Sequence, residues 1–259
     1  IIKKYYYIMS GYKFTFVIGF RYKADRISLL RRTLDWVNTF IDVEVILVEQ
    51  DKHSKIEHLN LACKHIFVKS DKPYNRSWAF NVALRRANSD VIIFGDSDLI
   101  IEQNQLINAI KGLKDYDMIS PYNKVIDLTP QESAQPTENI LKIDRDGRGQ
   151  NDNQKINISG GIAIFKREAI IKIGGWNENF VGWGAEDDEM TIRVKKYLKW
   201  AEAEGSCYHL YHDRPAPDKN DYNKNLNLLK SIYELTDEQR VVMINKMAKN
   251  SGFLNKYDN

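Results

Sequence analysis

The sequence predicts an α/β fold with a central, mostly parallel, twisted sheet flanked by helices. Short apolar runs alternate with amphipathic segments over the first hundred residues, which is the order of β-α-β units. The composition is that of a globular protein, since 43% of the 259 residues are hydrophobic and 28% are charged.

The first half of the chain supplies most of the predicted sheet. Four short apolar runs are expected to be strands: 14–20, 43–48, 66–68 and 91–94. Apolar residues at helical spacing predict a helix over 25–40 and another over 77–87.

At the start of the second half, the sequence changes from mainly apolar runs to polar residues and prolines. Residues 121–156 are polar and contain three prolines, so we expect a long loop that is either functional or disordered. A strand is predicted over 161–165 and a helix over 187–197. The tail after Pro217 is expected to form two helices, the second opened by a capping box from Thr236 to Gln239.

Charge, hydropathy and cysteine content exclude several classes of protein. The formal net charge of +3 is too small to indicate nucleic-acid binding. No apolar run reaches transmembrane length, and residues 1–7 hold too short an apolar stretch for a secretory signal. Cys63 and Cys207 give no disulfide framework, so we expect a reducing, cytoplasmic compartment.

The segment from Val181 to Glu189 is the most informative part of the sequence. Trp183 lies between two glycines, and four acidic residues follow at positions 186–189. Clustered carboxylates repel one another, and glycines make a loop mobile, so the pattern suits a site that stacks on a sugar and keeps one carboxylate as a base. The alternative is a solvated acidic helix N-terminus, which suits the helix dipole.

A second acidic pair, Asp96 and Asp98, follows the apolar run that ends at Phe94. This position is the carboxyl end of a predicted strand, where open α/β sheets bind ligands. One or two carboxylates with substrate phosphates commonly hold Mg²⁺ or Mn²⁺. The alternative is that Asp-Ser-Asp simply forms a turn.

Two histidines, His209 and His212, lie three residues apart near an apparent strand end. Mn²⁺ accepts imidazole beside carboxylate. A lone histidine is more often a packed or surface residue, but the chain has only five, and a pair at this spacing favours a metal site.

Together these motifs resemble the GT-A fold of nucleotide-diphospho-sugar transferases. Within it the chain is similar to the β-1,4-galactosyltransferase family and to the galactosyltransferase-like domains of bacterial chondroitin-type polymerases. The Trp-Gly-x-Glu-Asp core is the specific motif. The matching residues, in family order over roughly 14–215, are Phe20-Arg21, Tyr74-Asn75-Arg76, Asn81, Asp96 to Ile100, Ser159-Gly160-Gly161, Gly174-Gly175-Trp176, Gly182 to Asp188 and His212.

The resemblance implies a division of the chain. Residues 1–12 would be an N-terminal tail, 13–218 the GT-A catalytic domain, and 219–259 a C-terminal helical extension. Within the catalytic domain, 13–120 would bind the nucleotide and 121–218 would carry the acceptor and catalytic groups.

The resemblance also implies how the donor and a divalent cation are held. Tyr74 would stack on uracil, with core packing as the alternative, while Arg21 and Arg76 approach the phosphates. The role of Arg26 stays open, because its spacing departs from the family pattern. Mn²⁺ or Mg²⁺ would offset charge on the departing diphosphate. The metal-ligand candidates are Asp98, His212, His209 and Asp96, and the other donor-binding candidates are Phe20, Asn75, Asp96, Ser97, Ile158, Gly160 and Trp183.

For the acceptor side, the resemblance implies that Trp183 lies between the two sugars and that Glu186 and Gly184 contact the acceptor. Asp187 would deprotonate the attacking hydroxyl, which gives inversion, whereas retaining polypeptide N-acetylgalactosaminyltransferases carry asparagine at that position. Ile158 falls where galactose-specific members carry tyrosine. UDP-GalNAc is therefore expected to serve at least as well as UDP-Gal, unless Ile158 packs inside the strand.

Three functions remain open. The first is an inverting, metal-dependent transfer of Gal or GalNAc from a UDP-sugar to a sugar hydroxyl, in polysaccharide or glycan synthesis. The second is a retaining transferase or a sugar nucleotidyltransferase, although residues 19–27 lack the Gly-rich phosphate loop of the latter. The third is a non-catalytic sugar-binding protein, which would need neither a metal nor a base.

Overall fold

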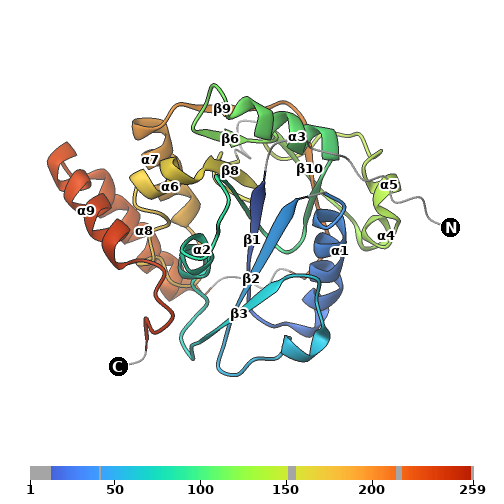
Figure 1. Ribbon diagram of the computed structural model, residues 1–259, viewed down its shortest axis with the longest axis horizontal. Coiled ribbons are helices and arrows are strands. Elements are labelled where there is room, and N and C mark those ends of the chain that lie inside the picture. Colours follow the sequence, from blue (N-terminus) through green and yellow to red (C-terminus); the bar gives the residue numbers. More distant parts are fainter. Residues whose placement is uncertain (1–12, 41, 151–155, 214–217, 258–259) are drawn as a thin grey trace.

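The fold is described by a computed structural model that covers residues 13–40, 42–150, 156–213 and 218–257. A seven-stranded sheet of order β3-β2-β1-β4-β8-β6-β9 runs through the molecule, with helices on both sides (Figure 1). A three-stranded sheet of order β5-β10-β7 adjoins it. The predicted α/β architecture is confirmed, whereas the predicted tail 1–12 lies outside the described residues.

The large sheet is mostly parallel, as expected. Strands β1 to β4 pair in parallel, whereas β8 is antiparallel to both β4 and β6. The carboxyl ends of the parallel strands share one edge of the sheet, which is where such sheets bind ligands. The strands are β1 (Phe14–Phe20), β2 (Val43–Asp51), β3 (Lys64–Lys69), β4 (Val91–Gly95), β5 (Leu99–Ile101), β6 (Met118–Ser120), β7 (Lys124–Asp127), β8 (Ala163–Lys166), β9 (Trp200–Glu202) and β10 (Ser206–His209).

Two apolar clusters cover the two faces of the large sheet. On β1, Phe16 packs in the cluster that includes α1 (Ile27–Val37), whereas Val17 belongs to the cluster that includes α2 (Arg76–Leu84). Successive side chains of a strand point to opposite faces, so an apolar run of this kind is buried on both sides. The two clusters fix β1 and β4, whose carboxyl ends carry site residues.

The remaining helices surround this core. The segment 121–156, expected to be a long loop, instead contains β7, α4 and α5, which corrects the prediction. Thr129 and Glu132 form a capping box that opens α4, and Ile140 is buried. These helices are α3 (Gln103–Gly112), α4 (Pro130–Ser133), α5 (Thr137–Ile140), α6 (Arg167–Lys172), α7 (Glu186–Tyr197), α8 (Lys219–Tyr233) and α9 (Asp237–Asn250), with 3₁₀ turns at Ala24–Arg26 and Glu57–Leu59.

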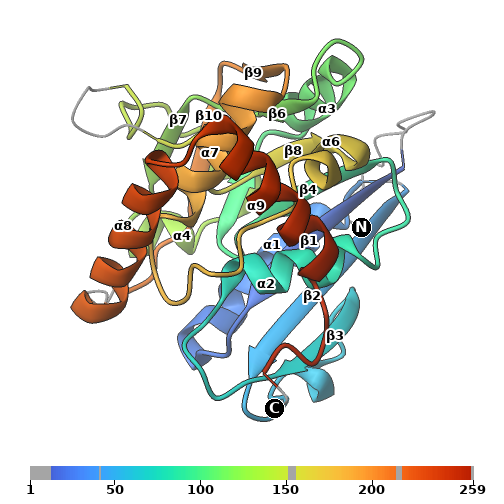
Figure 2. The same cartoon turned by 90° about the vertical axis from the view of Figure 1, so that its left-hand side faces the viewer.

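The two predicted C-terminal helices are present, and the capping box at Thr236 opens α9 as expected. Figure 2 shows α8 and α9 lying against the α6 and α7 side of the molecule. Glu178 anchors the segment after α9, because it accepts hydrogen bonds from Gly252 N (2.6 Å) and Lys256 Nζ (2.7 Å). Of the helices in the described ranges, none has the length and apolar character to cross a membrane.

Candidate active site

A cleft of about 860 Å³ opens at the carboxyl ends of β1 and β4. This volume is within the usual range for small-molecule sites. Most of the residues expected from the sequence line it: Phe20, Arg21, Tyr74, Arg76, Asp96, Ser97, Asp98, Gly160, Trp183, Glu186, Asp187, His209 and His212.

Arg76 joins the two acidic motifs across the cleft. Its Nε donates to Asp96 Oδ1 at 2.8 Å and its Nη1 to Asp187 Oδ1 at 2.6 Å, while Glu186 Oε1 lies 3.7 Å from Nη1. Burial lowers the pKa of the guanidinium, but the three carboxylates outweigh it, and the pKa of Arg76 lies well above its ordinary value. One cation thus holds three acids together that would otherwise repel.

The position of Arg76 follows from the start of α2. Asn75 caps this helix, because its Oδ1 accepts from Trp78 N at 2.8 Å. The guanidinium then lies over the rings of Phe80 (4.6 Å) and Trp176 (5.2 Å). Asn75 is fully buried and is absent from the cleft wall, so its predicted donor contact is corrected to a structural role.

The acidic segment forms the first turn of α7, where the helix dipole favours negative charge. It is not merely a solvated helix end. Glu189 is buried and pairs with Arg193, whose Nη1 also donates to Gly175 O at 2.6 Å. This buried pair ties α7 to the Gly174-Gly175 turn and fixes the direction in which Glu186 and Asp187 point.

Burial perturbs the two leading carboxyls of α7. Burial and the charge of Asp187 raise the pKa of Glu186 to about 8. Burial also raises the pKa of Asp187, against the opposing charge and hydrogen bond of Arg76. Because Arg76 contacts Asp187 most closely, Glu186 is the carboxyl that takes up a proton first. The cleft therefore holds two adjacent carboxyls whose pKa values are both raised, and Asp187 has the closer cation.

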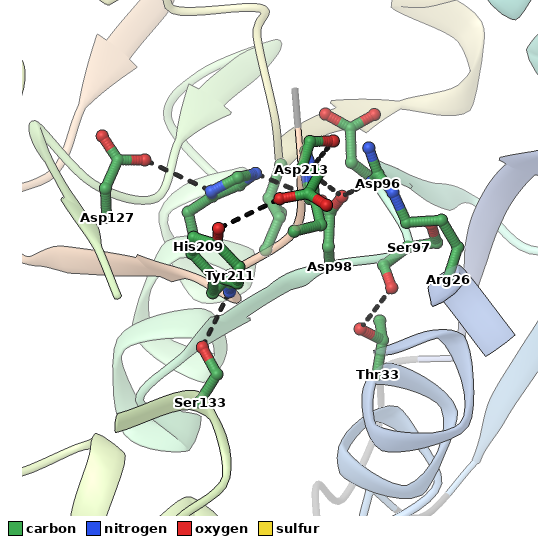
Figure 3. A network of polar contacts seen from close by, with 12 residues as sticks. Arg26, Thr33, Asp96, Ser97, Asp98, Asp127, Ser133, His209, Tyr211 and Asp213 are labelled. Atoms are coloured by element: carbon green, nitrogen blue, oxygen red, sulfur yellow. Dashed lines mark hydrogen bonds and ion pairs between the residues drawn. The ribbon is translucent and has the colours of Figure 1, made fainter. Parts of the chain in front are cut away.

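A third group of residues, Asp98, His209 and His212, fits a divalent cation. Their ligand atoms lie within 4.8 Å of one another. His212 Nε2 is 3.3 Å from Asp98 Oδ2. His209 Nε2 is 3.8 Å from Asp98 Oδ1 (Figure 3). Burial raises the pKa of Asp98, but the His212 hydrogen bond and nearby positive charges outweigh it, so the net pKa lies below the ordinary value. A carboxylate with two imidazoles is a donor set that Mn²⁺ accepts.

Two expectations about this metal-ligand cluster change. Asp96 does not belong to it within the described residues, because its carboxylate pairs with Arg76. Arg26, whose role the sequence left open, donates from Nη1 to Asp98 Oδ2 at 2.7 Å. It therefore acts as a counter-charge for the buried carboxylate, 72 residues away in sequence.

The Ser159-Gly160-Gly161 turn forms the floor beside Asp187. The Tyr122 hydroxyl donates to Gly160 O at 2.8 Å and accepts from Ile162 N at 3.0 Å. Gly161 has φ +65°, and a Cβ there would lie 2.2 Å from the same hydroxyl, so only glycine fits. Tyr122 was not identified from the sequence, since nothing in its local pattern marks it.

Ile158 does not lie on this floor. It is 4% exposed and packs in the apolar cluster with α2, whereas Ile156 and Asn157 line the cleft. The expectation that its side chain faces the donor sugar is therefore wrong, and the alternative of core packing describes its position.

Helix α8 supports the Trp183 loop. Asn225 Nδ2 donates to Val181 O (3.1 Å) and to Trp183 O (3.3 Å). The ring of Tyr222 lies 5.4 Å from that of Trp183, which is 64% exposed. A Cβ on Gly184 would lie 2.9 Å from Tyr222, so close packing against this ring explains the glycine. Gly184, expected to contact the acceptor, is not among the residues that line the cleft.

Tyr74 and Arg21 lie together on the cleft wall, and Gly182 N of the Trp183 loop donates to Tyr74 O at 2.8 Å. Arg21 donates to Gln50 O (3.0 Å) and Lys72 O (2.7 Å), and its guanidinium is 5.9 Å from the Tyr74 ring. Burial raises the pKa of the Tyr74 phenol, so the hydroxyl stays protonated. The ring is thus held at the cleft wall by its neighbours.

Two family models match the chain. The model of glycosyl transferase family 2 matches residues 24–174. The model described as the N-terminal domain of galactosyltransferase matches residues 151–213, which include the acidic segment and both histidines of the metal-ligand cluster.

The curated relatives are galactosyltransferases of greater length. β-1,4-Galactosyltransferase 4 of Cricetulus griseus is 25% identical over 183 residues, which are 68% of this chain and 40% of that protein. The human β-1,4-galactosyltransferase 4 is 28% identical over 131 residues, covering 48% of this chain and 30% of that protein. The chain thus spans less than half the length of these relatives.

Solved structures share the fold at lower identity. GalNAc-T7 with UDP, GalNAc and Mn²⁺ has a TM-score of 0.60 and 16% identity, covering 97% of this chain and 57% of that one. S. aureus TarS has a TM-score of 0.58 and 14% identity, covering 91% and 42%. A Drosophila β-1,4-galactosyltransferase 7 mutant with manganese, UDP-Gal and xylobiose has a TM-score of 0.50 and 18% identity, covering 81% and 78%. The predicted GT-A fold is confirmed.

Proposed function

The chain belongs to glycosyl transferase family 2, and we propose that it moves galactose or N-acetylgalactosamine from a UDP-sugar to a sugar hydroxyl, with inversion. One observation carries the proposal. The carboxyl pair Glu186–Asp187, held by Arg76, lines the same cleft as the metal-ligand cluster of Asp98, His209 and His212.

Asp187 is the proposed general base. It takes the proton of the acceptor hydroxyl as that oxygen bonds to the anomeric carbon, while the bond from that carbon to the diphosphate breaks and UDP leaves with the electron pair. Glu186, whose pKa is raised to about 8, donates its proton in a hydrogen bond to an acceptor oxygen. When Glu186 is protonated, it places no second negative charge beside Asp187.

Arg76 restrains the base before substrate binds. Its ion pair with Asp187 at 2.6 Å opposes the rise that burial causes in the pKa of this carboxyl. Its Nη2 atom is buried and has no hydrogen-bond partner among the described residues, so that donor is available for a phosphate or sugar oxygen. Arg76 is therefore proposed to contact the donor and to position Asp187 at the same time.

A divalent cation is proposed to bind at Asp98, His209 and His212. When bound, Mn²⁺ or Mg²⁺ would offset the charge that develops on the departing diphosphate. Arg26 already balances Asp98, so the carboxylate is held in the ionised form that a metal ligand needs. The Mn²⁺ complexes among the structural relatives support this choice of ion.

The nucleotide is proposed to lie toward Arg21 and Tyr74. The Tyr74 ring offers a stacking surface and Arg21 offers a charged donor, both on the cleft wall. The exposed ring of Trp183, in the loop whose Gly182 N donates to Tyr74 O at 2.8 Å, is proposed to contact both sugars. Because Ile158 is in the core, its size gives no basis for choosing between Gal and GalNAc donors.

UDP release from a panel of UDP-sugars tests the proposal. UDP-Gal, UDP-GalNAc and UDP-Glc are incubated with free and oligomeric sugar acceptors, in Mn²⁺ or in excess EDTA. We expect acceptor-dependent release of UDP from UDP-Gal or UDP-GalNAc, and its loss in EDTA. Full activity in EDTA would show that the reaction needs no divalent cation. Tight sugar binding without any turnover would indicate a binding protein.

A further inference from the structure

The small sheet places an acidic residue on each side of His209. Strand β10 lies between β5 and β7, and His209 is the register partner of Leu99 on one side and of Asp127 on the other. Asp98 immediately precedes β5, and its backbone oxygen accepts from Leu210 N at 2.9 Å. Backbone pairing therefore fixes Asp98, His209 and Asp127 in a row.

The two ring nitrogens of His209 face these two carboxylates. Nδ1 lies 3.2 Å from Asp127 Oδ1, and Nε2 lies 3.8 Å from Asp98 Oδ1 (Figure 3). A neutral imidazole carries its proton on one nitrogen and a lone pair on the other. Which nitrogen is available to a metal is set by the hydrogen bond that the other one makes.

We propose that Asp127 is a positioning residue that sets the tautomer of His209. By accepting a hydrogen bond from Nδ1–H, Asp127 directs the Nε2 lone pair toward Asp98 and His212, where the cation of the proposed function would bind. The inference rests on that function, but it concerns a residue outside the metal-ligand cluster and off the wall of the cleft.

The polar run after α5 holds Asp127 in place. Arg148 donates from Nε to Asp127 Oδ2 (2.8 Å) and from Nη2 to Oδ1 (3.1 Å), and Arg145 Nη2 donates to Asp127 O (2.8 Å). The backbones of Val125 and Arg148 exchange two hydrogen bonds of 2.9 Å. A Cβ on Gly147 would lie 2.4 Å from Val125 O, so the run can approach β7 this closely only with glycine there.

Arg148 itself lines the cleft, and through Asp127 the same run also acts on His209. Arg145 and Arg148 restrain Asp127, and Asp127 in turn orients His209 so that its Nε2 faces the proposed cation. The Asp127 and Arg148 side chains are 39% and 37% exposed, so their ion pair contributes little to stability. Orientation of the histidine, rather than stabilisation of the strand, is the effect that this contact can supply.

Mn²⁺ affinity is the first test. Electron paramagnetic resonance is used to titrate Mn²⁺ into the protein at a fixed UDP concentration, so the readout does not depend on turnover. We expect Asp127→Ala to weaken Mn²⁺ binding by about 10–100-fold, the usual effect of losing such a partner, and Asp127→Asn, which keeps an acceptor oxygen, to lie between. The matched control is Asp144→Ala, which removes an exposed carboxylate that pairs with Lys124 on the same strand. It should bind Mn²⁺ like the wild type.

The tautomer of His209, in the wild type and in Asp127→Ala, is the second test. Long-range ¹H–¹⁵N correlation spectra of the metal-free protein should show the Nδ1-protonated form, and a mixture of tautomers in Asp127→Ala. An Nε2-protonated wild type would overturn the inference, and so would wild-type Mn²⁺ affinity in Asp127→Ala. If the wild type binds no Mn²⁺, or if Asp98→Ala binds it normally, the metal site of the proposed function itself fails.

Discussion

Replacing Asp187 by asparagine is the most informative change in the catalytic carboxyl pair. Asparagine has nearly the same size and still accepts a hydrogen bond from Arg76 Nη1, which lies 2.6 Å from Asp187 Oδ1. It cannot take up the acceptor proton. We therefore expect the fold and the position of Arg76 to survive while the base is lost.

The expected loss follows from the role assigned to this carboxylate. General base catalysis contributes about 10²–10⁴-fold, which at about 1.36 kcal/mol per tenfold is a barrier increase of about 2.7–5.4 kcal/mol. The effect should appear in kcat. UDP affinity should change little, because the groups assigned to the nucleotide base, Arg21 and Tyr74, make no hydrogen bond or ion pair with Asp187 among the described residues.

The assay measures UDP release at saturating donor and acceptor, with UDP binding followed by calorimetry. Asp188→Asn is the matched control, because Asp188 is in the same helical turn but accepts from Asn157 Nδ2 at 2.9 Å and makes no ion pair with Arg76 within the described residues. Wild-type kcat in Asp187→Asn would refute the assignment. An equal loss in Asp188→Asn would show that the effect is not specific to the proposed base.

Three further predictions concern the cleft and the core beside it. The value of kcat/KM should fall as the pH decreases through the pKa of Asp187, which burial raises, because the base must be ionised. It should fall again above about pH 8, as Glu186 loses its proton. Glu186→Gln should abolish only this alkaline fall in kcat/KM. Asn225→Ala removes two hydrogen bonds that hold the Trp183 loop, so acceptor KM should rise by roughly fivefold for each ~1 kcal/mol lost. Because Asn225 is 3% exposed, the same loss should also lower the temperature of thermal unfolding. Ile158→Tyr should overpack the core and destabilise the protein by about 1–3 kcal/mol in denaturant unfolding without changing the ratio of kcat/KM for the two donors.

The sequence predicts the large sheet well because its strands are apolar on both faces. β1 is predicted at its observed bounds, and the β2 and β4 runs fall within the observed strands. The same criterion misses α3, β6 and β9. Residues 103–112 carry Leu106, Ile107 and Ile110 at helical spacing after the cap residue Glu102, so the sequence does contain a signal for α3.

The loop expected over 121–156 was wrong for a physical reason. Its prolines and charges suggest solvent exposure, yet Thr129 and Glu132 form a capping box just after one short strand. Pro130 is at the first position of α4, where a missing backbone N–H costs nothing. Prolines therefore marked helix starts here rather than the absence of structure.

The candidate site could be assembled from the sequence only where the family motif supplies long-range information. Asp98, His209 and His212 do come together as one metal-ligand cluster, over a separation of more than 100 residues. The contacts of Arg26 with Asp98 and of Asp127 with His209 were not predictable, because they depend on the register of the small sheet and on the packing of α1. No local pattern encodes that register.

The anomeric configuration of the product tests the central claim most directly. Proton NMR of the disaccharide or longer product made from an α-linked UDP-sugar reports, through the coupling of the new anomeric proton, whether the linkage is β or α. A single displacement with Asp187 as base predicts a β-linked product and equimolar UDP, formed only with a divalent cation present. An α-linked product would contradict the account, since it requires retention and a different role for the Glu186–Asp187 pair.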